Sequence, residues 1–322
     1  MQVPKFTRAA ILCLCIFGNI ALPAQTLDKE EKAAAIRAIA GYIAANYVFP
    51  EKGGQIASHI QSVHFRGEFD KAATWKEFDK MVTESLQRFS GDRHLYVKNN
   101  PHEVRKLKLA SGGGTETIGN EDEKDAEGNY GISESKVLTN NIGYLKLTGI
   151  DINDRSLPLL YAAMRTVENT DALIIDLRNN GGGGSVKGAV IESYFFEENT
   201  PLLDFTGRNG VMNTDSTVSW LKEKKYSGPV YVLINQKTAS AAEALAFVLQ
   251  KKKRAKVVGE RSAGAAYKND WFVVNDENYV SVSTASPNLH GTMRTWEGTG
   301  IVPDIKVKND DALAFILNKI GR

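Results

Sequence analysis

Two short apolar runs, each ending in a polar corner ahead of a helix-forming segment, constrain the fold most. They are residues 172–177 (ALIIDL) and 230–235 (VYVLIN). β-branched runs of this length, bounded by turn residues, are typical of strands. Strands alternating with helices predict an α/β fold. We expect further strands at residues 142–147 and 256–259, a hairpin over residues 271–284 and a closing amphipathic helix over residues 310–320.

The second run leads into QKTASAAE (residues 236–243), which places Ser240 in a sharp turn before a helix over residues 241–249. A hydroxyl at the head of a helix lies near unpaired backbone N–H groups, where the dipole favours a developing negative charge. We therefore interpret Ser240 as a candidate nucleophile. The alternative is that Ser240 only caps the helix, as serine does in many proteins.

The first run ends in RNNGGGGS, with four glycines from Gly181 to Gly184 before an expected helix over residues 186–196. Glycine allows close approach of the backbone to a ligand, so these N–H groups suit an oxyanion hole. A phosphate-binding loop fits poorly, because Lys187 and Ala189 stand where that motif requires glycine and lysine. A plain flexible turn is the other alternative.

A serine nucleophile needs a base with a pKa near neutrality, which histidine supplies. Of the five histidines, His94 in FSGDRHLYV follows a predicted helix and precedes a predicted strand, and we choose it as the base. Glu297, between Trp296 and a glycine turn, is the candidate carboxylate that orients the imidazole. The alternative interpretation is that Glu297 is an ordinary surface residue.

Five ordered motifs together resemble one superfamily of serine peptidases. It comprises the tail-specific (C-terminal processing) proteases, the tricorn protease core and the interphotoreceptor retinoid-binding protein modules. The resemblance covers nearly the whole chain after its first residues. The motifs are NYVFPE at residues 46–51, GDRHLYV at 91–97, DLRNNGGG at 176–183, TASAAE at 238–243 and WEGTGIVPDI at 296–305.

The superfamily has two catalytic solutions, and the resemblance favours one of them. Tail-specific proteases pair serine with a lysine in a segment similar to GERSAGAAY (residues 259–267), but Ala265 stands at that position and Lys268 lies three residues further on. The tricorn and retinoid-binding branch uses a histidine and a glutamate that correspond to His94 and Glu297. The chain departs from tricorn at Arg93, where that branch carries a serine.

The resemblance implies acyl transfer to Ser240 in a peptidase acting on peptides or unfolded proteins, with no cofactor. It places the oxyanion between the N–H of Ala241 and one from Gly181 or Gly182, and makes Asn179 and Asn180 candidate substrate-binding residues. Two alternatives remain open: a non-catalytic carrier of a small apolar ligand on the same scaffold, and an esterase or amidase acting on non-peptide substrates.

Residues 1–25 predict a secretory signal peptide, with basic Lys5 and Arg8, an apolar stretch and small residues before a break. We expect export to a periplasm or the extracellular space, without a stable membrane anchor. Cys13 and Cys15 both fall in this segment, so the mature chain would form no disulfide. With 40 basic and 38 acidic residues in all, the chain gives no reason to expect nucleic acid as a partner. Its oligomeric state is left open.

The length of 322 residues predicts two structural parts. A helical domain is expected over residues 26–90, where Ile36, Ile39 and Ile43 repeat at helical spacing. An α/β catalytic domain is expected over residues 91–322. The resemblance implies a layered, crotonase/ClpP-like superhelical α/β fold there, and the interval after His94 is too short for a PDZ domain.

Residues 111–129 combine glycines with an acidic run and contain too little apolar content to fold alone. We interpret this stretch as a loop, with a lid over the site as the alternative. The sequence shows no internal repeat and no metal-ligand cluster.

Overall fold

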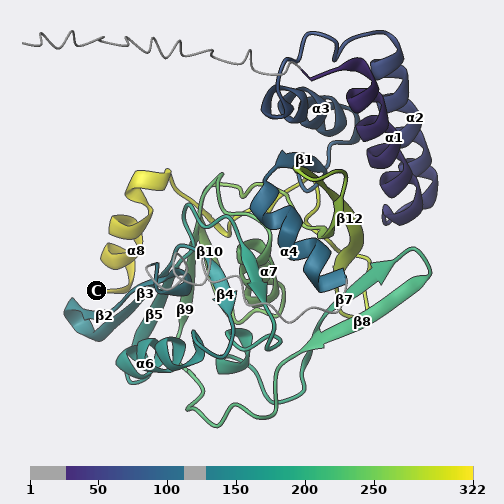
Figure 1. Cartoon of the computed structure of the whole chain (residues 1–322). Helices are drawn as coiled ribbons and strands as arrows, with labels where there is room; N and C mark the ends of the chain where they lie inside the picture. Colours follow the sequence, from purple (N-terminus) through teal and green to yellow (C-terminus); the bar gives the residue numbers. More distant parts are fainter. Residues whose placement is uncertain (1–26, 112–127, 322) are drawn as a thin grey trace, which may run out of the picture.

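A computed structural model describes residues 27–111 and 128–321 (Figure 1). The expected signal peptide, both cysteines and most of the acidic stretch lie outside these residues. The described chain is a mixed α/β structure with helices at its amino-terminal end and a β-sheet core, as the sequence predicts. The helices are α1 (Lys29–Asn46), α2 (Pro50–Phe65), α3 (Trp75–Ser90), α4 (Pro101–Ser111), α6 (Leu157–Val167), α7 (Ala241–Lys251) and α8 (Ala312–Ile320).

Two of the three amino-terminal helices, α1 and α3, begin at residues whose side chains satisfy free backbone N–H groups. Asp28 and Glu31 form a reciprocal capping box at the start of α1. Thr74 accepts the N–H of Glu77 at the start of α3, and Gly91 ends that helix in the left-handed region at φ 74°. Their apolar stripes form one core with side chains from two strands, which include Val97 and Val280. The helices are therefore packed onto the edge of the β structure.

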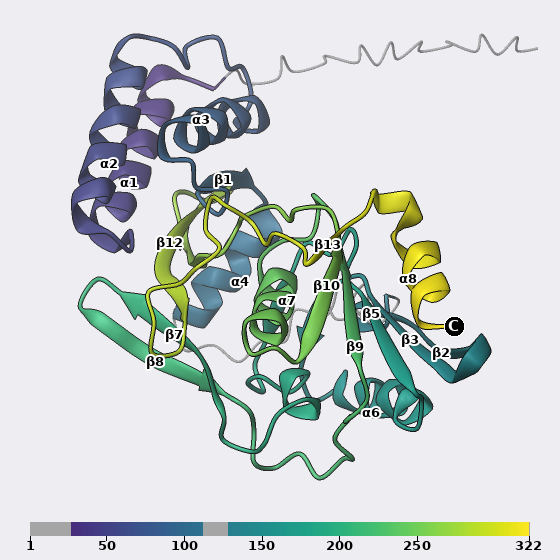
Figure 2. The same cartoon turned by 180° about the vertical axis from the view of Figure 1, so that it is seen from behind.

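The central sheet has the strand order β13-β10-β9-β5-β3-β2, parallel throughout except for β2. Alternate residues of β5 face opposite sides: Leu173 packs in the core that contains α6 and α7, whereas Ile174 packs in the core that contains α8. The sheet is thus a layer between helices (Figure 2). Its strands are β2 (Ile132–Leu138), β3 (Ile142–Leu147), β5 (Ala172–Asp176), β9 (Val230–Ile234), β10 (Ala255–Gly259) and β13 (Ile305–Lys306).

A second, antiparallel sheet has the order β1-β12-β7-β8, with β11 also paired to β12. The long β12 joins the predicted hairpin to strands from distant parts of the chain. A third pairing, β4 with β6, is parallel and lies beside the central sheet. These strands are β1 (Tyr96–Asn99), β4 (Ile150–Ile152), β6 (Gly183–Ser185), β7 (Pro201–Gly207), β8 (Gly210–Ser216), β11 (Lys268–Val273) and β12 (Asn278–Leu289).

The expected strands, hairpin and closing helix are confirmed to within a few residues, but the helix expected over residues 186–196 is wrong. Within that range only the 3-10 turn Glu192–Tyr194 is helical. The residues just before the range, Gly183–Ser185, form β6 and pair with Ile150–Ile152. Apolar residues there fill the core without helical periodicity, and the extended glycines are held by their strand partner.

Asp79 of α3 gives the packing of helices on strands a pH dependence. Its buried Oδ1 accepts a hydrogen bond from Nδ2 of Asn278 on β12 at 2.6 Å. Burial raises the pKa of Asp79 to about 7, and the bond from Asn278 only partly opposes this. The folded protein therefore retains a proton that the unfolded chain loses above pH ~4, so the free energy of unfolding falls as pH rises toward 7.

We predict that Asp79→Asn flattens this fall and raises the free energy of unfolding at pH 8 by roughly 1–3 kcal/mol. Urea unfolding of both proteins at pH 5 and pH 8 measures the difference, with the exposed Asp171→Asn as control. Parallel pH profiles for wild type and Asp79→Asn would contradict the prediction.

Candidate active site

The serine corner and the glycine corner meet because β5 and β9 are neighbouring parallel strands. The carboxyl ends of such strands lie at the same edge of the sheet, the usual place for a ligand site in an α/β fold. The N–H of Ala239 donates to the carbonyl of Asn180 at 2.9 Å. The hydroxyl of Thr238 donates to the carbonyl of Leu177 at 2.8 Å. The two corners are therefore joined by hydrogen bonds.

Ser240 lies directly before α7 in a strained backbone conformation, with φ 54° and ψ −125°. A non-glycine residue with positive φ costs on the order of 1–3 kcal/mol and persists only where the surroundings hold it. Here the Ser240 N–H donates to the carbonyl of Ala265 and to Oε2 of Glu243, each at 3.1 Å. The turn projects a half-buried hydroxyl from the head of a helix.

Glu243 supports this corner in a way that the sequence reasoning missed. Its fully buried carboxylate accepts four hydrogen bonds. The donors are the N–H of Ser240 (3.1 Å), the hydroxyl of Ser262 (2.5 Å) and the N–H groups of Gly264 (2.7 Å) and Ala265 (2.9 Å). Glu243 thereby fixes the loop 262–265 against Ser240. Its place three residues after Ser240, at the third position of the helix, was the available signal.

His94 reaches Ser240 from the other side of the site, 146 positions away in the chain. Its Nε2 lies 3.3 Å from Oγ of Ser240, within hydrogen-bonding distance. Asp92 Oδ1 accepts the backbone N–H of His94 at 2.8 Å, and the hydroxyl of Ser281 on β12 donates to the His94 carbonyl at 2.6 Å. Burial lowers the pKa of His94, an effect that the charge of Asp92 partly opposes. The imidazole is therefore neutral near pH 7.

Glu297 is bonded to the backbone of the segment that follows Ala265, not to the imidazole as the sequence predicts. Its Oε2 accepts the N–H of Ala266 at 2.6 Å and that of Tyr267 at 3.2 Å. Burial raises the pKa of Glu297 to about 7, with a smaller contribution from the charge of Asp92. Within residues 27–111 and 128–321, Nδ1 of His94 has no hydrogen-bond partner. The carboxylate of Glu297 is therefore bonded to backbone N–H groups, and no hydrogen bond joins it to the imidazole among the described residues.

Asp92 is a second carboxylate at this position, and sequence reasoning did not select it. It is buried, and its Oδ2 has no hydrogen-bond partner among the described residues. Its charge acts on His94, Glu297 and Tyr47 alike. The signal for Asp92 was its position two residues before His94 in the GDRH motif.

The glycine loop touches Ser240 directly. A Cβ on Gly182, whose φ is 104°, would lie 2.6 Å from Cβ of Ser240 and 3.0 Å from the Ala241 nitrogen, so only glycine fits. The Gly182 N–H donates to Oδ1 of Asn180 at 2.8 Å and is used within the loop. Of the four glycines in this loop, Gly183 and Gly184 line the neighbouring cavity together with Ala241. Gly181 is exposed beside them.

Asn179 and Asn180 build the corner through hydrogen bonds within the protein. Asn180 is fully buried and its Nδ2 donates to the carbonyl of Leu147 at 3.0 Å. Asn179 exchanges hydrogen bonds with the side chain of Asn235, one through its backbone N–H and one through Oδ1, both at 3.0 Å. These bonds hold both residues within the protein, and the role of Asn179 and Asn180 in substrate binding stays a prediction.

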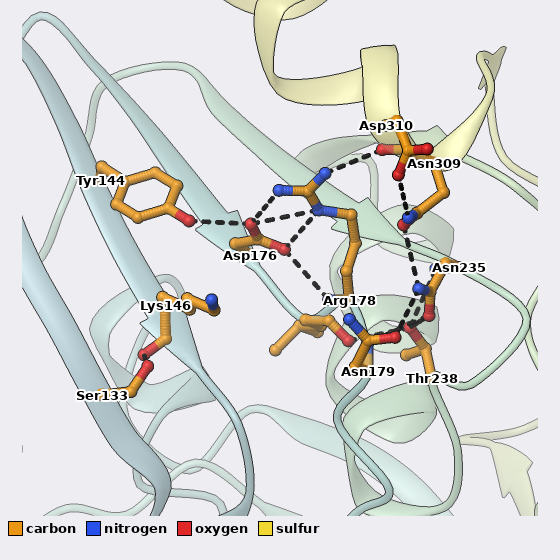
Figure 3. A network of polar contacts seen from close by, with 11 residues as sticks. Ser133, Tyr144, Lys146, Asp176, Arg178, Asn179, Asn235, Thr238, Asn309 and Asp310 are labelled. Carbon is orange, nitrogen blue, oxygen red and sulfur yellow. Dashed lines mark hydrogen bonds and ion pairs between the residues drawn. The ribbon is translucent and has the colours of Figure 1, made fainter.

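A polar network behind the corner ties it to the carboxyl-terminal segment (Figure 3). Arg178 forms a bidentate pair with the buried Asp176, at 2.9 Å and 2.6 Å, and donates to the carbonyl of Asn309 at 2.8 Å. Tyr144 donates to Asp176 at 2.8 Å, and Asn309 accepts from Asn235 at 3.0 Å. The bidentate pair and the bond from Asn235 to Asn309 connect the ends of β5 and β9 to the carboxyl-terminal segment.

A cavity of about 470 Å³ opens beside Ser240. Its walls include Val248, Trp296 and Lys268. Lys268 is exposed at the start of β11, and Ala265 meets Ser240 only through its backbone carbonyl. In the part of the chain that the structure describes, no three acidic, histidine or cysteine side chains are grouped to hold a metal ion, and no helix has the length and hydrophobicity to span a membrane.

An α/β layered fold with a serine in a strand-to-helix corner and a histidine at its hydroxyl is typical of serine hydrolases. Residues 141–307 match peptidase family S41, and residues 27–127 match the N-terminal domain of Peptidase_S41 in eukaryotic IRBP. Because the first match covers more than half of the sequence, the chain belongs to peptidase family S41. Curated proteins similar to it are C-terminal processing peptidases.

Among the relatives, carboxyl-terminal-processing peptidase 2, chloroplastic, of Arabidopsis thaliana is 32% identical over 148 residues, which are 45% of this chain and 28% of that protein. The chain spans 28–38% of the length of the first curated relatives. The photosystem II D1 C-terminal processing protease has a TM-score of 0.55 at 16% identity, covering 90% of this chain and 97% of that one. The tricorn protease has a TM-score of 0.59 at 12% identity, covering 91% and 36%. These two likenesses concern the fold alone.

The strain at Ser240 yields a prediction about stability. Glycine adopts positive φ without a Cβ penalty, whereas alanine retains the strain. We expect Ser240→Gly to raise the free energy of unfolding by about 1 kcal/mol relative to Ser240→Ala. Urea denaturation of the two variants measures this difference. A glycine variant no more stable than the alanine variant would show that the turn is not strained.

Proposed function

We propose that this protein is an exported serine peptidase that hydrolyses peptide bonds through an acyl-enzyme on Ser240, with His94 as the general base. The observation that carries the proposal is the 3.3 Å approach of Nε2 of His94 to Oγ of Ser240, made by segments 146 positions apart. A helix-capping serine has no need of a half-buried, neutral histidine at its hydroxyl. Membership of family S41 supports the same reaction.

In the proposed reaction, Oγ of Ser240 attacks the carbonyl carbon of the scissile bond while Nε2 of His94 takes the hydroxyl proton. The tetrahedral intermediate collapses, the C–N bond breaks, and His94 returns the proton to the leaving amine. Water then attacks the acyl-enzyme carbonyl and gives its proton to His94. Release of the carboxylate product returns the proton to Ser240.

The oxyanion is proposed to lie against the N–H of Ala241, in the first turn of α7, and an N–H of the glycine loop. Because Gly182 already donates to Asn180, Gly181 or the cavity-lining glycines are the better second donors. Loss of one such donor typically costs about 10²–10³ in rate.

Two carboxylates are available to stabilise the imidazolium that forms on His94. We assign the orienting role to Glu297, as the resemblance implies, with Asp92 contributing charge from the His94 segment itself. A lysine base is less well supported, since Ala265 occupies the position of the tail-specific lysine. The proposed organisation is a helical domain over residues 26–90 and a catalytic domain over residues 91–322, exported by the leader at residues 1–25.

The peptidase proposal predicts selective labelling of Ser240. A fluorophosphonate probe should form an adduct on Ser240, mapped by mass spectrometry, that is absent in Ser240→Ala and slowed by about 10⁴-fold or more in His94→Ala. His59→Ala on α2 is the control histidine. Folded protein without an adduct would refute the acyl transfer proposal, and adduct formation with turnover of esters but not peptides would favour an esterase.

Acylation should also depend on pH through His94. The base must be neutral, and burial holds its pKa below the usual value of 6.5, so the second-order rate of labelling should be constant near pH 7 and fall only at more acidic pH. Labelling rates from pH 4.5 to 8 give the midpoint. A midpoint above 6.5 would contradict the role of burial.

A further inference from the structure

The cavity beside Ser240 carries two acidic side chains that the reaction does not use. Glu192 comes from the 3-10 turn Glu192–Tyr194, and Asp215 comes from β8. Within the described residues, neither side chain forms an ion pair or a hydrogen bond to another residue, and the Glu192 carboxylate interacts only with its own backbone N–H. Ionising a carboxylate in a partly buried cavity wall costs free energy unless a positively charged group, here one from a ligand, pairs with it.

The strand register shows that Asp215 is directed by the pleat toward this cavity. Leu203 of β7 pairs with Asp215, and Phe205 pairs with Asn213. All four line the cavity, while Asp204 and Thr214 bond to each other on the opposite face. Alternate residues of a hairpin face one side, so Asp215 is part of a continuous wall and not a stray surface charge.

Burial raises the pKa of Glu192 to about 7, and burial also raises the pKa of Asp215. Each effect marks a carboxylate that lacks enough compensating charge. Lys268 is a positively charged side chain on the cavity wall, and its charge lowers the pKa of Asp215. Lys268 is exposed and forms no ion pair among the described residues. With both carboxylates ionised, the cavity retains a net negative charge.

We propose that this cavity receives the substrate side chain on the acyl side of the scissile bond, and that Glu192 and Asp215 select a lysine or arginine there. Apolar walls, among them Val248 and Trp296, suit the methylene stem of such a side chain, and the carboxylates suit its charged head. A volume of about 470 Å³ accommodates either residue. This inference rests on the proposed acyl transfer at Ser240.

Two matched measurements test it. In the wild type, kcat/KM is compared for acetyl-dialanyl thioesters ending in lysine or in uncharged norleucine, which has a similar stem. In Ser240→Ala, the corresponding amides are titrated by calorimetry, which needs no catalysis. We expect lysine to be preferred about 10-fold or more in both, as for a desolvated ion pair. We expect the preference to fall to about twofold or less in Glu192→Gln/Asp215→Asn.

Glu197 is an exposed neighbour of the 3-10 turn, and Glu197→Gln should keep the wild-type preference for lysine. If Glu192→Gln disturbs folding, Asp215→Asn alone should still reduce that preference. Equal use of lysine and norleucine, or an unchanged preference in the double variant, would overturn the proposal. Acylation without discrimination removes only this inference. A lysine preference in calorimetry without any acylation removes only the proposed peptidase reaction.

Discussion

The parallel pairing of β5 with β9 is the constraint on which the site depends. It fixes Ile174 opposite Tyr231 and so brings two strand ends to one edge of the sheet. The bond from Ala239 to Asn180 then joins the corners that follow them. The close contact of Gly182 with Ser240 is a direct result, since both residues stand a few positions beyond paired strands. The β5–β9 ladder thus gives the nucleophile its neighbours before any side chain is considered.

The histidine depends on a different sheet. His94 lies between α3 and β1, and the β1–β12 pairing places Tyr96 opposite Ser281, whose hydroxyl holds the His94 carbonyl. The apolar core beneath this pairing is shared with α1, α2 and α3. The serine and the histidine therefore meet only when the amino-terminal helices are packed on β12. The helical part contributes to the chemistry by placing the base, although none of its side chains reaches Ser240.

Local patterns predicted much of this arrangement. Apolar runs gave β3, β5, β9 and β10 nearly to the residue, and the turn chemistry around Ser240 and His94 indicated both residues. What local patterns could not give is long-range pairing. Gly183–Ser185 became a strand only because Ile150–Ile152 lies beside it, and the amide of Asn180 points inward because Leu147 offers a carbonyl there. The role of Glu243 depends on such pairing too, since Ser262, Gly264 and Ala265 reach it from a loop about twenty residues further along the chain.

The electrostatics around His94 fit a base that is neutral before the proposed reaction and charged during it. Desolvation lowers the pKa of the imidazole, which favours the form that can accept the serine proton. When the proton is transferred, a cation appears beside buried Asp92, whose charge already acts on the imidazole. The charge of Asp92 raises the pKa of Glu297, so the two carboxylates repel each other while the imidazole is neutral. A positive imidazolium relieves that repulsion. In the proposed reaction, the charge of Asp92 therefore stabilises the state that follows proton transfer more than the resting state, which is the condition for electrostatic catalysis.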